Sequence, residues 1–297
     1  MTDIILLDGG MGQELVQRAG DKPTALWSTQ IMIDHPGMVA GVHADFYSAG
    51  ATIATANSYA IHRDRLAKTK MEGRFFDLHA MAIAEAKAAT VAHGSGQIAG
   101  AIGPLGASYR PDLHPETNVA VRLFAEVAEQ LVDNSGLIIG ETIASIAHAQ
   151  DLLTATKPLG KPVWLALTLD DSDGTRLRSG EPVASVLPVI ESGVGAILIN
   201  CCTPEVIPDA LKIIGEVGIP YGAYANGFEH ITDEFLRDSP TVDTLNLRRD
   251  FTPKLYADHV MGWIDQGATI VGGCCEVGPT HIAEIAQRLR VAGHQIV

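Results

Sequence analysis

Four cysteines are the residues of this sequence with the clearest capacity for chemistry. They form two adjacent pairs, Cys201-Cys202 and Cys274-Cys275, which lie far apart in the chain. Adjacent cysteines rarely build a disulfide framework, and clustered cysteines more often bind a metal or react. Three thiolates suit Zn²⁺, a tetrahedral ion that favours sulfur, and leave its fourth position open for a substrate. The alternative is that buried cysteines act only as small hydrophobic side chains.

The expected ligands are Cys201, Cys274 and Cys275. One strand end should aim only one member of a pair inward, because neighbouring side chains alternate faces. Cys201 directly follows a predicted strand, so we assign it in preference to Cys202. Cys274 and Cys275 can both point inward only where the strand is broken, and two glycines precede them. An open site of this kind binds a substrate thiol and removes its proton near neutral pH.

The elements that must position these cysteines follow a regular rhythm. Eight short apolar runs predict strands at 4–7, 51–56, 97–102, 136–139, 162–169, 196–199, 220–224 and 268–271. Amphipathic stretches between them predict helices, among them 36–49, 117–132, 204–217 and 279–291. Continuously apolar strands that alternate with helices indicate a buried parallel sheet. Eight such units predict an α/β fold, a (β/α)8 TIM barrel forming one domain over residues 1–297. An open doubly wound sheet is the competing architecture.

Polar residues and cysteines follow the predicted strands, and in a barrel those positions converge on one mouth. The candidates, in chain order, are Asp8, Gly9, Gly10, Asn57, Glu141, Cys201, Asn226, Cys274 and Cys275. Two polar segments that also follow strands, 106–115 and 170–182, are predicted loops and candidate lids on the same face. Asp8 has a second interpretation, as a loop carboxylate bonded to local backbone.

Composition limits the class of partner. The chain has 297 residues, 46% of them hydrophobic, and a formal net charge of −14. Such an acidic protein is a poor partner for nucleic acid or an anionic membrane. No stretch is apolar enough for a signal peptide or a membrane span, so a cytoplasmic protein is expected. Small-molecule substrates are the expected partners, and a homo-oligomer remains open.

Several segments together resemble the homocysteine S-methyltransferase family. They are Leu-Asp-Gly-Gly-Met-Gly-Gln-Glu-Leu at 7–15, Asn-Ser-Tyr at 57–59, Ile-Gly-Pro at 102–104, Gly-Glu-Thr at 140–142, Ile-Asn-Cys at 199–201 and Gly-Gly-Cys-Cys at 272–275. The resemblance covers nearly the whole chain in order. It implies that Cys201, Cys274 and Cys275 are zinc ligands and that Gly9 and Gly10 form the backbone turn beside homocysteine. It also implies that Glu141 receives the substrate ammonium group and that Asn57 lies near the amino-acid end.

The resemblance implies an enzyme of methionine biosynthesis. It would transfer a methyl group from a sulfonium or quaternary ammonium donor, S-methylmethionine being favoured, to the homocysteine thiolate. The favoured donor follows from the absence of a long C-terminal extension and of a cobalamin or folate module. Departures from the family pattern at Leu105, Ala225 and Glu276 leave the donor open. Two alternatives remain: a zinc-binding homocysteine sensor or scaffold without efficient turnover, and the same chemistry on a different thiol.

Overall fold

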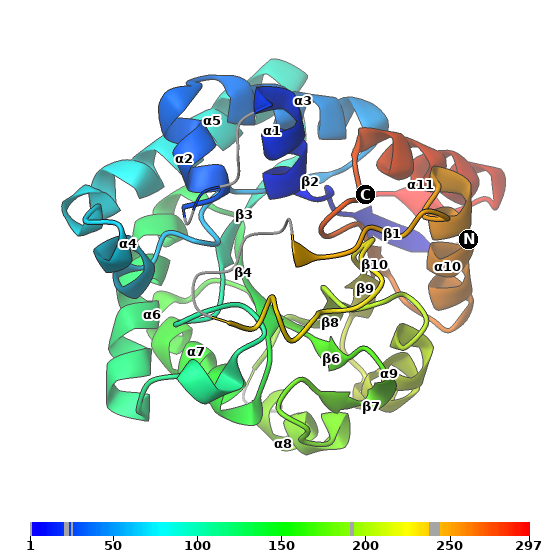
Figure 1. Cartoon of the computed structure of the whole chain (residues 1–297). Coiled ribbons are helices and arrows are strands. Elements are labelled where there is room, and N and C mark those ends of the chain that lie inside the picture. The colour runs from blue at the N-terminus through cyan, green and yellow to red at the C-terminus, as the bar shows by residue number, and fades with distance from the viewer. Residues whose placement is uncertain (1, 21–23, 25, 191–192, 238–243) are drawn as a thin grey trace.

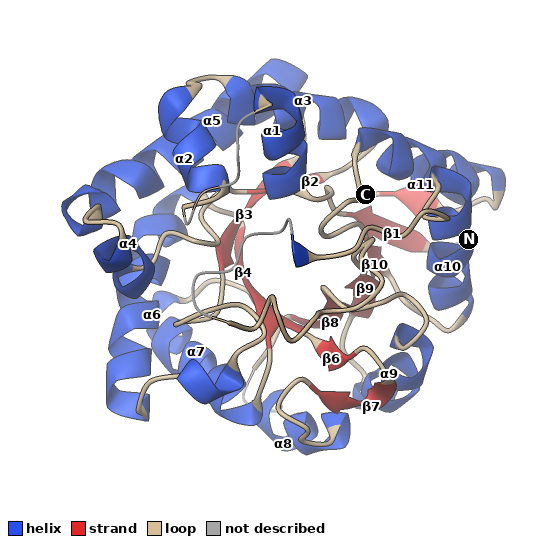
Figure 2. Cartoon of the chain, viewed as in Figure 1, coloured by secondary structure: helices blue, strands red, loops and turns tan. Residues whose placement is uncertain are grey.

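The computed structural model describes residues 2–20, 24, 26–190, 193–237 and 244–297. Eight parallel strands form a ring, and helices surround it (Figures 1 and 2). The ring consists of β1 (Asp3–Leu6), β2 (Ile53–Thr55), β3 (Gln97–Ile102), β4 (Leu137–Ile143), β5 (Val163–Leu167), β8 (Ala196–Asn200), β9 (Tyr221–Tyr224) and β10 (Ile270–Val271). A short strand β11 (Gln295–Ile296) pairs with the first two residues of β1.

The ring closes between its first two strands. Neighbouring strands pair in the order β1-β10-β9-β8-β5-β4-β3-β2, and a parallel bridge between Leu7 and Ile53 joins the last to the first. The Thr52 amide donates to the Leu6 carbonyl at 2.7 Å in the same seam. The predicted (β/α)8 barrel is therefore confirmed, and the open doubly wound sheet is wrong because no free edge separates β1 from β2.

The outer layer is helical. Its α-helices are α1 (Met11–Ala19), α2 (Ser28–Asp34), α3 (Met38–Ala49), α4 (Arg63–Lys68), α5 (Phe75–His93), α6 (Thr117–Leu131), α7 (Ile146–Thr156), α8 (Leu187–Ile190), α9 (Ile207–Ile214), α10 (Pro253–Asp265) and α11 (Pro279–Val291). Short 3-10 turns lie at Glu72–Arg74, Pro111–Leu113, Val132–Asn134, Lys157–Leu159, Val183–Val186 and Gly215–Val217. Among the described residues, no helix combines the length and apolar character that crossing a membrane requires.

Alternation along each strand builds two cores. On β8, Ala196 and Leu198 pack inside the barrel with residues such as Trp164, whereas Ile197 and Ile199 pack under the helices. Successive strand side chains point to opposite faces, so a fully apolar strand fills both layers at once. This explains why the predicted strands are continuously hydrophobic.

Several boundaries differ from the predictions, and hydrogen bonds explain two of the differences. The strand predicted at 162–169 is interrupted at Thr168, whose hydroxyl donates to the Cys201 carbonyl at 3.1 Å. The strand predicted at 268–271 begins only at Ile270, because Ala268 still bonds back to Trp263 at the end of α10. The helix predicted at 204–217 begins at Ile207. β4 runs four residues beyond the predicted end at 139, which places Glu141 and Thr142 inside it.

The segment predicted as a loop at 170–182 contains a β-hairpin. Strands β6 (Leu169–Asp170) and β7 (Asp173–Leu177) pair antiparallel beside the barrel mouth. The Asp170 carboxylate accepts from the Ser172 amide at 2.8 Å and from its hydroxyl at 2.6 Å, which fixes the tight turn. The loop prediction was wrong because polar side chains dominate a hairpin that is solvated on one face.

Candidate active site

Three cysteine sulfurs meet at the mouth of the barrel. Cys201 directly follows β8, and Cys274 and Cys275 follow the glycine pair after β10. Their three sulfur atoms all lie within 4.8 Å of one another. Cys201 and Cys274 are joined by a disulfide with a Cα–Cα distance of 5.7 Å, and Cys275 is a free thiol. The structure thus brings together the three cysteines that the sequence analysis selected.

The fourth cysteine points the other way. Cys202 is fully buried in the core between barrel and helices, and burial raises the pKa of its thiol to about 12. Its neighbour Cys201 faces the mouth because the backbone turns there, with a φ of 52°. Cys202 is therefore a packing residue, as expected when one strand end aims a single side chain inward.

The sulfur cluster has the chemistry of a metal site. Two thiolates on a tetrahedral Zn²⁺ lie about 3.8 Å apart, given Zn–S bonds of about 2.3 Å. The spread of the three sulfurs is compatible with that geometry. The disulfide occupies two of the three sulfurs, so it must be reduced before all three can bind an ion. Burial, with Glu276 and Glu141 nearby, raises the pKa of Cys275 to about 12, so without a cation it stays a thiol.

Unusual backbone conformations concentrate around this cluster. Non-glycine residues rarely adopt positive φ, and they persist there only when their surroundings hold them. The described residues that do so are Trp27, Lys70, Tyr109, Thr142, Cys201 and Glu276. Four of them line the cavity beside the cysteines, and Glu276 directly follows Cys275. The fold therefore accepts strain where it aims side chains into the mouth.

Gly9 and Gly10 let the first strand end touch the cysteine turn. A Cβ on Gly10 would lie 2.5 Å from the Cys274 carbonyl oxygen, and one on Gly9 would lie 2.0 Å from that of Val277. Any larger residue would push the two segments apart. The Gly10 amide already donates to the Val277 carbonyl at 2.9 Å. Gly10 therefore contributes close packing, and its amide is engaged within the protein.

Glu141 is aimed by a bulge in β4. The pairing of β4 with β5 shifts register between Gly140 and Ile143, and Thr142 has a φ of 57°. The Asn200 side chain holds this bulge by accepting from the Thr142 amide at 3.0 Å. Bulges next to active sites commonly re-aim a side chain.

The carboxyl of Glu141 accepts from the Tyr224 hydroxyl at 2.8 Å. Burial raises the pKa of Glu141 to about 7, and the Tyr224 hydrogen bond opposes this rise. Glu141 thus changes charge near neutral pH.

Asp8 lies in the seam that closes the barrel. Its two oxygens accept from the Thr55 amide and hydroxyl, each at 2.7 Å. Burial raises the pKa of Asp8 to about 7. The His43 ring nitrogen lies 3.8 Å away, but burial lowers the pKa of His43 to about 3, so the histidine is neutral and forms no ion pair. The interpretation of Asp8 as a carboxylate bonded to local backbone is wrong in its partner, because the amide and hydroxyl it binds belong to Thr55 on β2, 47 positions along the chain.

These residues line a cavity of about 230 Å³. One water needs about 10–15 Å³ of such volume, so the cavity admits organic molecules of amino-acid size. Among the predicted site residues its lining includes Asp8, Gly9, Gly10, Asn57, Glu141, Cys201, Cys274 and Cys275. The Asn57 amide nitrogen donates to the Ser28 carbonyl at 3.3 Å. Asn226 does not line the cavity; it is buried, and its side-chain oxygen accepts from the Phe228 amide at 3.2 Å.

The sequence analysis missed several lining residues. Phe235 and Leu245 are two of them, and they form an apolar cluster with the cysteines, Tyr109 and Phe228. Trp27, Arg65 and Lys68 line the cavity from the segments before α2 and on α4. None of these three follows a strand directly, so the strand-end rule does not select them. For Arg65 and Lys68 the available signal was their three-residue spacing on a short helix after the second strand.

Comparisons with known proteins show the family of the chain. Residues 5–289 match the homocysteine S-methyltransferase family model. A homocysteine S-methyltransferase of Escherichia coli is 29% identical, covering 96% of this chain and 95% of that protein. A selenocysteine methyltransferase of Astragalus bisulcatus is 27% identical, covering 94% of this chain and 90% of that protein.

The crystal structures of the homocysteine methyltransferase MmuM from Escherichia coli share the fold. The metallated form matches with a TM-score of 0.81 at 25% identity, and the oxidized form with 0.80 at 27%. Each match covers 97% of this chain and 96% of that structure. The chain therefore belongs to the homocysteine S-methyltransferase family and is a methyltransferase.

Proposed function

We propose that this enzyme transfers a methyl group from a sulfonium or quaternary ammonium donor to the thiolate of homocysteine, giving methionine. S-Methylmethionine is the favoured donor. The observation that carries the proposal is the meeting of three cysteine sulfurs at a cavity in a chain of this family. The site is proposed to depend on Zn²⁺ held by Cys201, Cys274 and Cys275 in their reduced state. We expect the reaction to take place in the cytoplasm, where thiols stay reduced.

A bound Zn²⁺ would supply the positive charge that lets the homocysteine thiol lose its proton near neutral pH. The chain's own residues would bind and orient the acceptor. Glu141, when ionised, is a partner for the substrate ammonium group. Asn57 and the turn at Gly9 are proposed to lie beside the amino-acid end. The apolar cluster around Phe228 excludes water from the reacting sulfur, which limits side reactions.

The proposed step balances without an oxidant or reductant. The homocysteine sulfur forms a bond to the methyl carbon as the donor's bond to that carbon breaks. The bonding electron pair returns to the donor heteroatom, which leaves as a neutral thioether or amine. The thiol proton is released to solvent. Holding two small substrates in line removes much of the entropic cost of their encounter.

Two alternatives to homocysteine methylation are kept. The similarity to a selenocysteine methyltransferase favours a second acceptor, the selenol or thiol of a related amino acid, by the same chemistry. A zinc-binding homocysteine sensor or scaffold would retain the cysteine cluster but turn over slowly. The sensor is expected to bind homocysteine and form no methionine with any donor.

The test is a donor screen on reduced, zinc-loaded protein with methionine as the readout. Wild-type protein with homocysteine and S-methylmethionine should form methionine, and Cys275→Ala should lose at least about 100-fold of that activity. Cys202→Ala is the matched control and should retain activity, because Cys202 faces the core. Absence of zinc after purification under reducing conditions, or turnover in Cys275→Ala equal to wild type, would contradict the proposal.

A further inference from the structure

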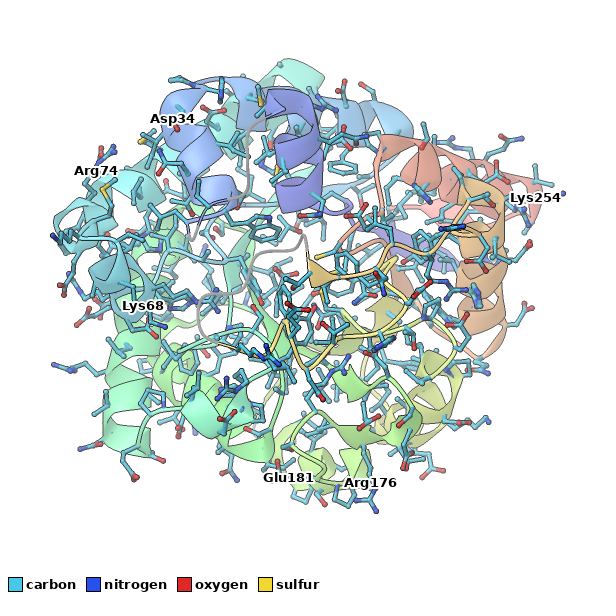
Figure 3. All side chains as sticks on the ribbon, viewed as in Figure 1. Asp34, Lys68, Arg74, Arg176, Glu181 and Lys254 are labelled. Atoms are coloured by element: carbon cyan, nitrogen blue, oxygen red, sulfur yellow. A yellow bond between two sulfur atoms is a disulfide. The ribbon has the colours of Figure 1, made fainter. Side chains whose placement is uncertain are left out.

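Two cations line the cavity on one wall. Arg65 and Lys68 lie three residues apart on α4, so they project from the same side of that helix. They are the lysine and arginine members of the described lining. Figure 3 labels Lys68 on the α4 side of the barrel, opposite Lys254. Arg65 is partly buried and Lys68 is exposed at the rim, so in a chain with a net charge of −14 these two lining cations give this wall a local positive charge that an anionic group can bind.

The charge of these two cations is not neutralised by the described carboxylates. Within the described part of the chain, no carboxylate forms a salt bridge with Arg65 or Lys68. Arg63, on the same helix, does pair with Glu126. The Nη2 of Arg65 donates to the Pro104 carbonyl at 2.7 Å, while its buried Nε has no partner among the described residues. A guanidinium offers five N–H donors, so Arg65 retains donors for an anion.

An aromatic surface adjoins the cations. The Arg65 guanidinium lies 5.5 Å from the Tyr59 ring centroid, and the Tyr59 hydroxyl lies 2.7 Å from that of Ser108. Trp27 meets the Tyr59 ring edge-on at 6.4 Å. Aromatic faces attract methylated cations. This wall therefore presents a surface for a positive methyl-bearing centre next to a site for a negative group.

We infer that Arg65 and Lys68 form the subsite that binds the carboxylate of the methyl donor. The inference rests on the proposed function and adds the residues that would position the donor. Glu141 lies with Tyr224 and is the proposed partner of the acceptor's ammonium group. The α4 wall is then left for the second substrate.

A carboxylate anchor suits this reaction. The donor's positive charge disappears during methyl transfer, so tight binding of that charge alone would stabilise the ground state more than the transition state. A remote carboxylate keeps its charge throughout the reaction. Pairing this carboxylate with Arg65 and Lys68 positions the donor equally well in the ground state and in the transition state. The bidentate hydrogen bonds of an arginine also fix the orientation of the carboxylate.

The experiment compares two sulfonium compounds that differ only in the carboxylate. S-Methylmethionine carries it, and dimethyl(3-aminopropyl)sulfonium lacks it. Calorimetric binding of each is measured without homocysteine, and KM and kcat are measured with it. Arg65→Gln and Lys68→Gln should each weaken S-methylmethionine binding about 10-fold or more and leave the carboxylate-free compound unchanged. Lys254→Gln, an exposed lysine on α10, is the matched control and should change neither.

Arg65→Lys separates charge from folding, because it keeps the cation if the glutamine variant disturbs the loop at Pro104. It should restore part of the lost affinity for S-methylmethionine only. Equal weakening of both compounds, no weakening of either, or a rise confined to the homocysteine KM would overturn the subsite. The binding data decide this even if no methionine forms, so failure of the proposed function is seen separately in the turnover assay.

Discussion

Glu141 is the residue whose charge state most directly governs a proposed substrate contact. Its pKa of about 7 means that roughly half of the carboxyl is protonated in neutral solution, and only the ionised half pairs with an ammonium group. If Glu141 has its proposed role, binding of homocysteine is coupled to the loss of a proton in the pH range where enzymes are normally assayed. The Tyr224 hydroxyl lowers the Glu141 pKa through its hydrogen bond, against the effect of burial.

This coupling gives a prediction at the residue scale. The kcat/KM for homocysteine should rise with pH through about 7 as Glu141 ionises. Glu141→Gln should abolish this rise, which is the acidic limb of the pH profile. It should also raise the homocysteine KM about 10–100-fold, as expected for loss of a charged hydrogen bond. Tyr224→Phe should move the limb to higher pH, because the bond that favours the carboxylate is lost. Steady-state kinetics between pH 5.5 and 8.5 measure all three.

The control for Glu141 is an acceptor without an amino group. With 3-mercaptopropionate, Glu141→Gln and wild type should have similar KM values, since no ammonium group is present. A pH limb in Glu141→Gln identical to that of wild type would assign the titration to another group and contradict the role proposed for Glu141.

The sequence predicted which cysteine sulfurs meet, but it did not predict how the neighbouring polar side chains are oriented. Cysteines are rare, their side chains are short, and a strand end fixes where each points, so Cys201 could be separated from Cys202. The aim of Glu141 depends on a bulge at Thr142, which leaves no mark in the hydrophobic pattern. Lining by Arg65 depends on where a short helix packs, which local spacing does not determine.

The β6–β7 hairpin is the element that supports the cysteine turn from outside the barrel. The Asp171 carboxylate accepts from the Thr203 amide at 3.0 Å and the Ile231 amide at 2.9 Å, and it pairs with Arg178 at 2.7 Å. The side chains of Asp171 and Arg178 are only 10% and 12% exposed. Arg178 also lies 5.3 Å from the Tyr109 ring centroid. The Asp171 carboxylate thus connects the hairpin to the turn after Cys201 and to the segment at Ile231.

Asp171→Asn should destabilise the protein and loosen the cysteine turn. The asparagine side chain is uncharged, so it cannot neutralise Arg178. Its NH₂ group also cannot accept a hydrogen bond, so one of the two backbone amides loses its partner. The free energy of unfolding is therefore expected to fall by about 2–4 kcal/mol. Thermal unfolding should show a lower Tm, and metal analysis should show weaker zinc retention at limiting chelator. Asp173→Asn, on the solvent side of the same hairpin, should match wild type in both. A wild-type Tm in Asp171→Asn would show that the hairpin does not hold the turn.

The elements themselves were largely predictable. All eight barrel strands were located, because a parallel strand buried on both faces is a continuous apolar run between turn signals. The hairpin escaped detection, since one face of it is solvated and its side chains are polar. Strand ends were misplaced where a side-chain hydroxyl or a backbone amide bonds elsewhere, as at Thr168 and Ala268 respectively. Periodicity reports burial, and it does not report individual hydrogen bonds.

Across the whole molecule, buried ionisable groups set the response to acid. Burial lowers the pKa of four histidines to about 3 or 4: His43, His62, His79 and His148. The native state keeps them neutral, while the unfolded chain protonates them below about 6.5. Asp8 and Glu141 act in the opposite direction, because the native state holds their protons up to about 7 and the unfolded chain releases them near 4.

The free energy of unfolding should therefore fall as the pH drops from 6 to 5. In that range about four histidines are protonated in the unfolded chain and neutral in the native state. About two carboxyl groups are protonated in the native state and ionised in the unfolded chain. For these six groups the difference of about two protons corresponds to about 2–3 kcal/mol per pH unit. Burial also lowers the pKa of His259 and His281, which adds to the slope in the same direction. The histidine contribution is complete above 6.5 and is lost on acidification, whereas the carboxyl contribution is complete near 4 and is lost as the pH rises to 7.

Two neutral substitutions should change this slope in opposite directions. Asp8→Asn removes one proton that only the native state holds, so the slope between pH 5 and 6 should steepen by about 1.4 kcal/mol per unit. His148→Gln removes one proton that only the unfolded chain binds, so the slope should flatten by about the same amount. Urea unfolding of the reduced, metal-free protein at several pH values gives all three slopes. If the free energy of unfolding has the same pH slope in wild type and in both variants, these protons are wrongly assigned to Asp8 and His148. The response to acid would then arise from other groups.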